Sequence, residues 1–369
     1  MGGGVVVLGV MLCLSCLQLS AASSGDRRLD FRQCVENCEV TGCAVLWPPV
    51  EGGRHCIKGC VAEDGENSGT AGTKNGSSAK WRGPTEPWYL PLTQWDCLSE
   101  CKYQCMVRVE TRKKNEAQSH PPYRAEQYFG KWPFVRVLGI EEVASVVFSI
   151  FNLLAHAYGL WSFSKLAATL PRSSSPGSPS LYGFIGLWKL FGVISINSWV
   201  WSIVFHSRST TFTERLDYVS AIISVGYNFL IALIRTLNFK QEALRAMISA
   251  PVIGFTSTHV LYMLFYDFDY GLNMKVCLVL AILQTTFWPI WAIAVKHPAM
   301  GKIFFVDFGM LAALGLEVFD FPPLFGLFDS HSLWHLATVP LVSCWWSFVQ
   351  DDARWTSKVA ALNDAKKPL

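Results

Sequence analysis

The chain has little charge and lacks the patterns of several common classes of protein. Only 16% of its 369 residues are charged and the net charge is +3, and no basic stripe alternates with aromatic residues, which argues against nucleic-acid binding. No G-x-S-x-G turn and no alternation of strand and helix patterns is present, which argues against a serine-nucleophile lipase. No internal repeat is visible, although transporters usually carry one.

Apolar residues are abundant instead. They make up 51% of the chain and gather in runs of about 20 residues, the length that crosses a bilayer as a helix. The sequence therefore predicts an all-α, polytopic membrane protein with seven transmembrane helices in a domain over 134–350. The expected spans are 141–162, 182–206, 216–235, 246–266, 271–295, 302–321 and 331–350. The sixth span is the least hydrophobic because it carries Asp307 and Glu317.

The N-terminal region has the features of a secreted segment. Residues 1–24 have an apolar centre followed by small residues, which predicts a signal peptide. The first residues contain no Lys or Arg, so an uncleaved anchor helix is the alternative. Residues 25–133 would then form a small luminal domain. Asn75 begins an N-x-S sequence there, which predicts glycosylation on the luminal side.

Cysteines are concentrated in this luminal region. Eight remain there after the signal peptide is removed, and an even number in an oxidising compartment predicts disulfides. Three pairs have C-x-x-x-C spacing, so a zinc site is the alternative, and the sequence does not choose among the 105 pairings that eight cysteines allow. The eight are Cys34, Cys38, Cys43, Cys56, Cys60, Cys97, Cys101 and Cys105. Cys277 and Cys344 lie in apolar runs and are expected to be packing residues.

The charges of the loops test how the chain is oriented across the membrane. With the N-terminal domain in the lumen, seven spans place residues 351–369 in the cytosol as a tail. Most loops expected in the cytosol carry basic residues and most of those expected in the lumen carry acidic ones, which follows the positive-inside rule. The expected luminal loop 207–216 is mixed, with Arg208, Glu214 and Arg215, and is neutral evidence. The basic set is Lys165, Arg172, Arg235, Lys240, Arg245, Lys296 and Lys302, and the acidic set is Asp267, Asp269, Asp320 and Asp329.

Five polar residues lie at the ends of apolar runs: Ser202, His206, Asp217, His331 and His335. Residues four apart share one face of a helix, so His331 and His335 can hold one metal ion together. The predicted topology places all five at the luminal ends of their helices. Ionisable groups at membrane depth are costly and mark candidate functional sites. Each residue alone has a structural explanation, and a proton relay is an alternative, but the combination at one depth indicates a site.

Zinc suits this set of side chains. Catalytic zinc usually keeps three protein ligands and one water, and it lowers the pKa of that water to about 7. His206, His331 and His335 would be the metal ligands. Asp217 would act as the general base that accepts a proton from the zinc-bound water and passes it to the leaving alcohol. Ser202 would donate a hydrogen bond to an oxyanion or orient Asp217. The pattern predicts a metal-dependent hydrolase.

The S-x-x-x-H, D and H-x-x-x-H pattern over seven helices resembles the CREST superfamily, which includes alkaline ceramidases and the progestin/adiponectin receptors. Within it the chain resembles the branch that remodels glycosylphosphatidylinositol (GPI), the post-GPI-attachment-to-proteins phospholipases. The resembling stretches include NSWVWSIVFHSRSTTFTERLDY, DFPPLFGLFDSHSLWHLATVPL and the cysteine motifs CVENC and CLSECKYQC. The resemblance covers essentially the whole mature chain.

The resemblance implies a phospholipase A2-type hydrolase that removes the sn-2 acyl chain of the GPI lipid on GPI-anchored proteins. It also implies that the three histidines bind Zn2+ with Asp217 and Ser202 beside the ion. Two alternatives stay open, a ceramidase-like amidase and a non-catalytic lipid receptor or GPI-biosynthesis scaffold. A small-lipid amidase would not need the luminal domain, whereas a protein-linked glycolipid could dock on it.

The last four residues resemble a sorting signal. Lys366 and Lys367 stand fourth and third from the end of the chain, as in dilysine retrieval signals, which face the cytosol and bind the COPI coat. The predicted topology places them there. We therefore expect residence in the endoplasmic reticulum membrane, with the Golgi as the second compartment.

Overall fold

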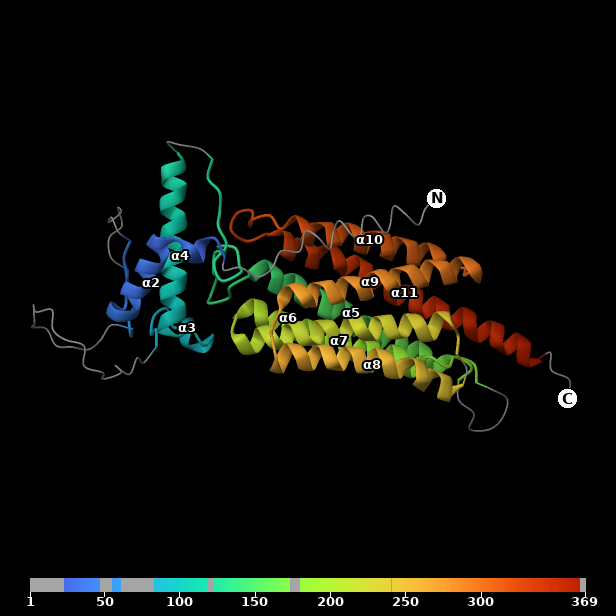
Figure 1. Cartoon of the computed structure of the whole chain (residues 1–369). Helices are drawn as coiled ribbons and strands as arrows, with labels where there is room; N and C mark the ends of the chain where they lie inside the picture. The colour runs from blue at the N-terminus through green and yellow to red at the C-terminus, as the bar shows by residue number, and fades with distance from the viewer. Residues whose placement is uncertain are drawn as a thin grey trace, which may run out of the picture. The chain divides into compact units, whose positions relative to one another are not determined.

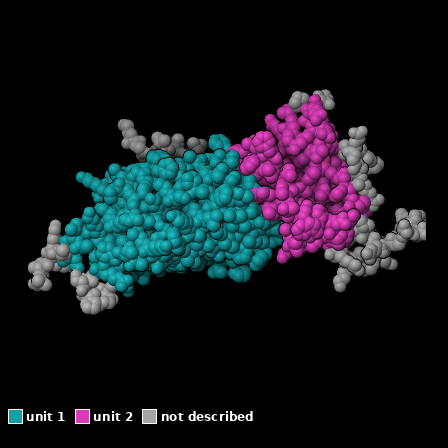
Figure 2. Space-filling model, turned by 180° about the vertical axis from the view of Figure 1, so that it is seen from behind, with its two compact units in different colours: residues 1–20, 144–320, 330–369 teal, residues 21–143, 321–329 magenta. Residues whose placement is uncertain are grey.

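The computed structural model describes residues 23–46, 55–60, 83–118, 122–172, 180–239 and 241–365. They form two compact units, coloured separately in Figure 2. We call Ala21–Val143 with Phe321–Asp329 the cysteine-rich unit, and Ala144–Asp320 with Ser330–Leu369 the helical unit. Three predictions fall outside the described residues: the signal peptide up to residue 22, glycosylation at Asn75, and the dilysine signal at Lys366 and Lys367.

The cysteine-rich unit is built on two helices that pack side by side. Its elements are the 3₁₀ helix η1 (Gly25–Arg27), α2 (Leu29–Thr41), β1 (Cys43–Ala44), β2 (His55–Cys56), α3 (Tyr89–Leu92) and α4 (Cys97–Ala117). Helix α2 ends at Gly42, which adopts φ 68°, a left-handed conformation that favours glycine. Helix α4 begins at Asp96, whose side chain accepts a hydrogen bond from the Ser99 amide.

All eight cysteines of this unit form disulfides, so the predicted framework is confirmed and none of the eight thiols is left for a metal. The C-x-x-x-C spacing places two cysteines of α2 and three cysteines of α4 on one face of each helix. Because α2 and α4 run antiparallel, the first cysteine of α2 pairs with the last of α4 and the second of α2 with the middle one of α4. The pairs are Cys34–Cys105, Cys38–Cys101, Cys43–Cys56 and Cys60–Cys97.

The helical unit holds seven long helices, close to the seven predicted spans (Figure 1). They are α5 (Val143–Thr169), α6 (Ile185–Ser207), α7 (Thr211–Thr236), α8 (Glu242–Phe265), α9 (Tyr270–Ala294), α10 (Met300–Phe319) and α11 (Ser330–Ala365). Among the described helices, five are long and apolar enough to cross a membrane, namely α5 to α9. Helix α10 carries three charged residues, Lys302, Asp307 and Glu317, and α11 begins with two histidines, so neither combines the high hydropathy and the low charge of the other five.

Helix α11 continues well beyond the predicted end at residue 350. Residues 351–365, which were expected to belong to a tail, are helical and include the buried Asp352. The Asp352 carboxylate accepts hydrogen bonds from Arg235 Nε of α7 at 2.8 Å and from the Tyr182 hydroxyl at 2.6 Å. Trp188 Nε1 donates to the same hydroxyl at 2.8 Å. This buried pairing explains the longer helix, because an unpaired carboxylate would be costly in that place.

We expect Arg235→Gln to destabilise the protein strongly. Arg235 and Asp352 are 4% and 0% exposed, and removing one partner of a buried pair costs about 3–5 kcal/mol because the other charge stays buried. The check is the melting temperature of the full chain in detergent. Lys189→Gln is the control, since Lys189 is an exposed neighbour of Trp188. Equal melting temperatures for wild type and Arg235→Gln would show that the buried pair of Arg235 and Asp352 does not stabilise the protein.

Candidate metal centre

The three histidines reach one point from two helices. His206 lies in the last turn of α6, and His331 and His335 lie in the first two turns of α11. Helix α6 ends just after His206, where Arg208 becomes extended. Helix α7 begins three residues later behind Thr210, whose side chain accepts a hydrogen bond from the Thr213 amide. This short connection holds the end of α6, and with it His206, next to the start of α7.

The Nε2 atoms of the three rings face one another. His335 Nε2 lies 3.0 Å from His331 Nε2 and 3.3 Å from His206 Nε2. Within the described ranges these three form the group with metal-ligating atoms, all within 4.8 Å of one another. His206 and His335 are each 3% exposed, whereas His331 is partly exposed. The cluster is thus accessible from one side.

The geometry fits a zinc ion. Zn–N bonds are about 2.0–2.1 Å, so nitrogens at the corners of a tetrahedral site lie about 3.3–3.4 Å apart. The two Nε2 separations, 3.0 and 3.3 Å, are close to this value. Three ring nitrogens held this close need a proton or a cation between them. The residues present therefore suit a three-histidine metal centre.

Glu317 fixes the protonation of one of the three histidines, His331. Its Oε2 lies 2.8 Å from His331 Nδ1, so Nδ1 carries the proton and Nε2 keeps a lone pair for a metal. The sequence patterns did not identify this role. The signal was present, because a carboxylate in an otherwise apolar span is costly and marks function. The partner could not be read from the sequence, since it depends on how α10 packs on α11.

Two further buried residues hold the start of α11. Asn152 of α5 donates from Nδ2 to the His335 carbonyl oxygen at 2.7 Å. The Thr338 hydroxyl donates to the same carbonyl at 2.8 Å and lies 3.2 Å from Asn152 Oδ1. All three residues are buried. These bonds fix the backbone that carries His335, and the sequence patterns did not single out Asn152 or Thr338.

Ser202 and Asp217 lie near the same helix ends but are not members of the histidine group. Ser202 is buried one turn before His206, and its Oγ is 3.0 Å from Ser149 Oγ of α5. Asp217 lies in the second turn of α7, is half-buried, and its backbone carbonyl accepts a hydrogen bond from Ser220. Their predicted roles in catalysis remain predictions.

Comparisons with known proteins point to one family. The model of the Per1-like family matches residues 87–353, a range that includes all three histidines. A Danio rerio protein named GPI-specific phospholipase A2-like PGAP3 is 34% identical, over 90% of this chain and 92% of its own length. A Drosophila melanogaster protein named post-GPI attachment to proteins factor 3 is 30% identical, over 94% and 92%. The Homo sapiens GPI-specific phospholipase A2-like PGAP3 is 28% identical, over 95% of both chains. No solved structure matches the chain.

Proposed function

The chain belongs to the Per1-like family, and on this premise we propose that it hydrolyses the sn-2 acyl ester of the GPI lipid on GPI-anchored proteins. The names of the relatives, GPI-specific phospholipase A2-like, support the choice of GPI lipid as the substrate. The observation that carries the chemistry is the convergence of His206, His331 and His335 at the end of apolar helices. A hydrolytic site at that depth suits an ester near the surface of a bilayer.

We assign each residue one task. His206, His331 and His335 would hold Zn2+, which supplies a Lewis acid and a water of lowered pKa. Asp217 takes a proton from the attacking water and passes it to the oxygen of the leaving alcohol. Ser202 donates a hydrogen bond from its hydroxyl to the carbonyl oxygen of the ester as that oxygen becomes negative, or orients Asp217. Glu317 keeps the Nδ1 proton of His331 in place. The products are a fatty acid and a GPI lipid with a free hydroxyl.

The proposed topology brings this site to its substrate. All seven helices would span the endoplasmic reticulum membrane, with the cysteine-rich unit in the lumen and the C-terminus in the cytosol. GPI-anchored proteins lie on the luminal side, where the histidines would be, and the cysteine-rich unit would dock them. The COPI coat would bind the signal at Lys366 and Lys367 and return the protein from the Golgi. This retrieval would keep the protein in the early secretory pathway.

The test is the acyl composition of GPI-anchored proteins in cells that lack this protein. We expect the original sn-2 chains to persist there, and we expect them to be removed when the wild-type chain is restored. His331→Ala should fail to restore removal, while His55→Ala should succeed, because His55 is exposed on β2 of the cysteine-rich unit. Normal sn-2 chains in the deficient cells would contradict the proposal, and changed ceramide levels alone would favour the amidase.

Glu317→Gln should weaken metal binding without abolishing it. The amide keeps the shape of the side chain but no longer presents a charged acceptor to His331 Nδ1. Loss of such a supporting group typically lowers metal affinity 10- to 100-fold. The measurement is competition for zinc by a chelator of known affinity, with purified protein.

Asp307→Asn is the matched control for this prediction. Asp307 is the other carboxylate of α10; it is buried, whereas Glu317 is partly buried, and it lies ten residues before Glu317. Removing its charge should leave the zinc affinity at the wild-type value. If both variants weaken zinc binding equally, then Glu317 acts through the general stability of α10 and not through His331.

A further inference from the structure

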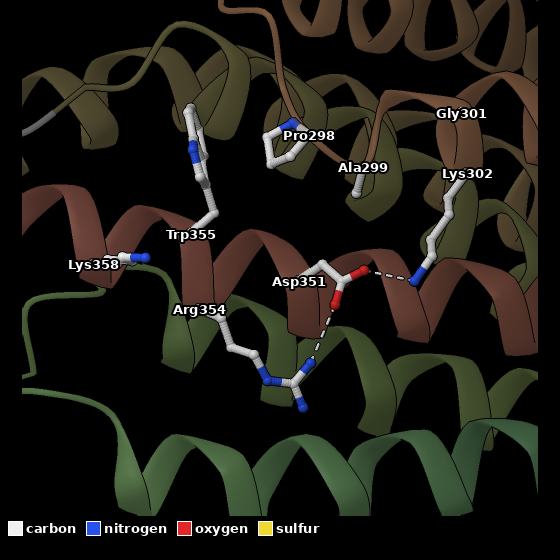
Figure 3. A pocket seen from close by; sticks show the side chains of 8 residues that line it. All are labelled: Pro298, Ala299, Gly301, Lys302, Asp351, Arg354, Trp355 and Lys358. Atoms are coloured by element: carbon white, nitrogen blue, oxygen red, sulfur yellow. Dashed lines mark hydrogen bonds and ion pairs between the residues drawn. The ribbon is translucent and has the colours of Figure 1, made fainter.

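A second polar site lies in the helical unit, between the start of α10 and the last third of α11. It is a cavity of about 570 Å³, within the usual range of small-molecule sites. Three cationic side chains line it, namely Lys302, Arg354 and Lys358, together with Asp351 and Trp355 (Figure 3). None of them belongs to the metal centre.

The cavity carries more positive than negative charge. Asp351 lies between two of the cations, with its carboxylate oxygens 2.5 Å from Lys302 Nζ and 3.1 Å from Arg354 Nη1 (Figure 3). Lys358 follows Arg354 by one helical turn and has no ion-pair partner among the residues that the structure describes. Three cations and one carboxylate leave a formal charge of +2. The N-terminal end of α10, at Met300, adds a favourable dipole for an anion.

The position of the cavity indicates where its ligand comes from. Helix α11 contains both His331 and Asp351, 20 residues apart in one continuous helix. At 1.5 Å per residue this separation is about 30 Å, the thickness of the hydrocarbon core of a bilayer. In the seven-span topology proposed above, the cavity therefore lies at the membrane surface opposite to the metal centre. Trp355, whose ring contacts that of His297 at 4.6 Å, suits such an interface.

We propose that this cavity binds the phosphate headgroup of an anionic phospholipid in the cytosolic leaflet. A phosphate monoester carries a charge of about −1.5 to −2, which matches the excess of two cations better than a singly charged diester does. Basic pockets between helices at this face are suited to such headgroups. Pro298, Ala299 and Trp355 provide the apolar part of the wall, against which the glycerol and the first acyl carbons would lie. Inorganic phosphate lacks that part and should bind less tightly.

The experiment is a titration of the full-length protein in a neutral detergent with fluorescent dioctanoyl phosphatidic acid, followed by anisotropy. Each basic residue near a membrane surface contributes about 5-fold to binding of anionic lipid. The double variant Arg354→Gln/Lys358→Gln should therefore bind roughly 25-fold more weakly. Both side chains are exposed, so the melting temperature should not change.

The control is Lys165→Gln, which should keep wild-type affinity. Lys165 is exposed on α5 with its Nζ 3.8 Å from the Trp161 ring centre, and it is expected at the same membrane face but outside the cavity. Equal weakening by this variant, or wild-type binding by the double variant, would overturn the proposal. Competition by inorganic phosphate as effective as by the lipid would overturn the lipid assignment, and equal binding of phosphatidylcholine would overturn the role of charge. The readout does not involve acyl hydrolysis, so it is independent of the proposed function.

Discussion

His335→Ala should leave the protein without zinc and without measurable release of the sn-2 acyl chain. His335 is the centre of the cluster, since its Nε2 is the atom that lies next to both other rings. Two remaining ligands cannot complete a three-histidine centre. A zinc ion there would provide several kcal/mol of transition-state stabilisation as a Lewis acid, so we expect the rate to fall at least about 1,000-fold.

Two measurements on purified protein check this expectation. Elemental analysis gives the zinc content, and hydrolysis of a GPI lipid gives the rate. His331→Ala should behave in the same way, whereas His55→Ala should keep both zinc and activity. Full zinc content in both His331→Ala and His335→Ala would show that these residues are not the ligands, whatever the effect on the rate.

The histidines could be predicted from the sequence because their signal is local. His331 and His335 are four residues apart, so any helix places them on one face, and apolar flanks make polar residues conspicuous. The contact of His206 with this pair comes from separate helices, and only the count of predicted spans suggested that they share one membrane face. In the structure all three meet.

Other features depend on packing between distant segments. The sequence predicted disulfides but not their pairing, because Cys34 meets Cys105 only once α2 and α4 have packed antiparallel. Glu317 and Asp352 were both visible as charges near apolar runs. Their partners, His331 and Arg235, belong to other helices. From hydropathy, the last span was predicted to end at residue 350. In the structure α11 continues beyond that point, where Asp352 forms its buried ion pair.

Asp217→Asn should separate the chemistry from the metal centre. Asparagine has nearly the same shape as aspartate but cannot accept the proton of the attacking water. General acid–base groups typically contribute about 100- to 10,000-fold to the rate. We therefore expect a rate loss of that size, with unchanged zinc content and unchanged cellular location, because Asp217 is not among the three residues that could hold the metal.

The competing explanation for Asp217 is that a carboxylate near the start of α7 stabilises the helix dipole. Glu214 lies three residues earlier in the first turn of the same helix, so Glu214→Gln removes the same charge at a position where the dipole effect is at least as strong. If the dipole is the whole role, both variants should lower the melting temperature slightly and hydrolyse the GPI lipid at the wild-type rate. If Asp217 is the base, only Asp217→Asn should lose the rate, and its zinc content should equal that of Glu214→Gln. An Asp217→Asn protein that hydrolyses at the wild-type rate would require a different base beside the histidines.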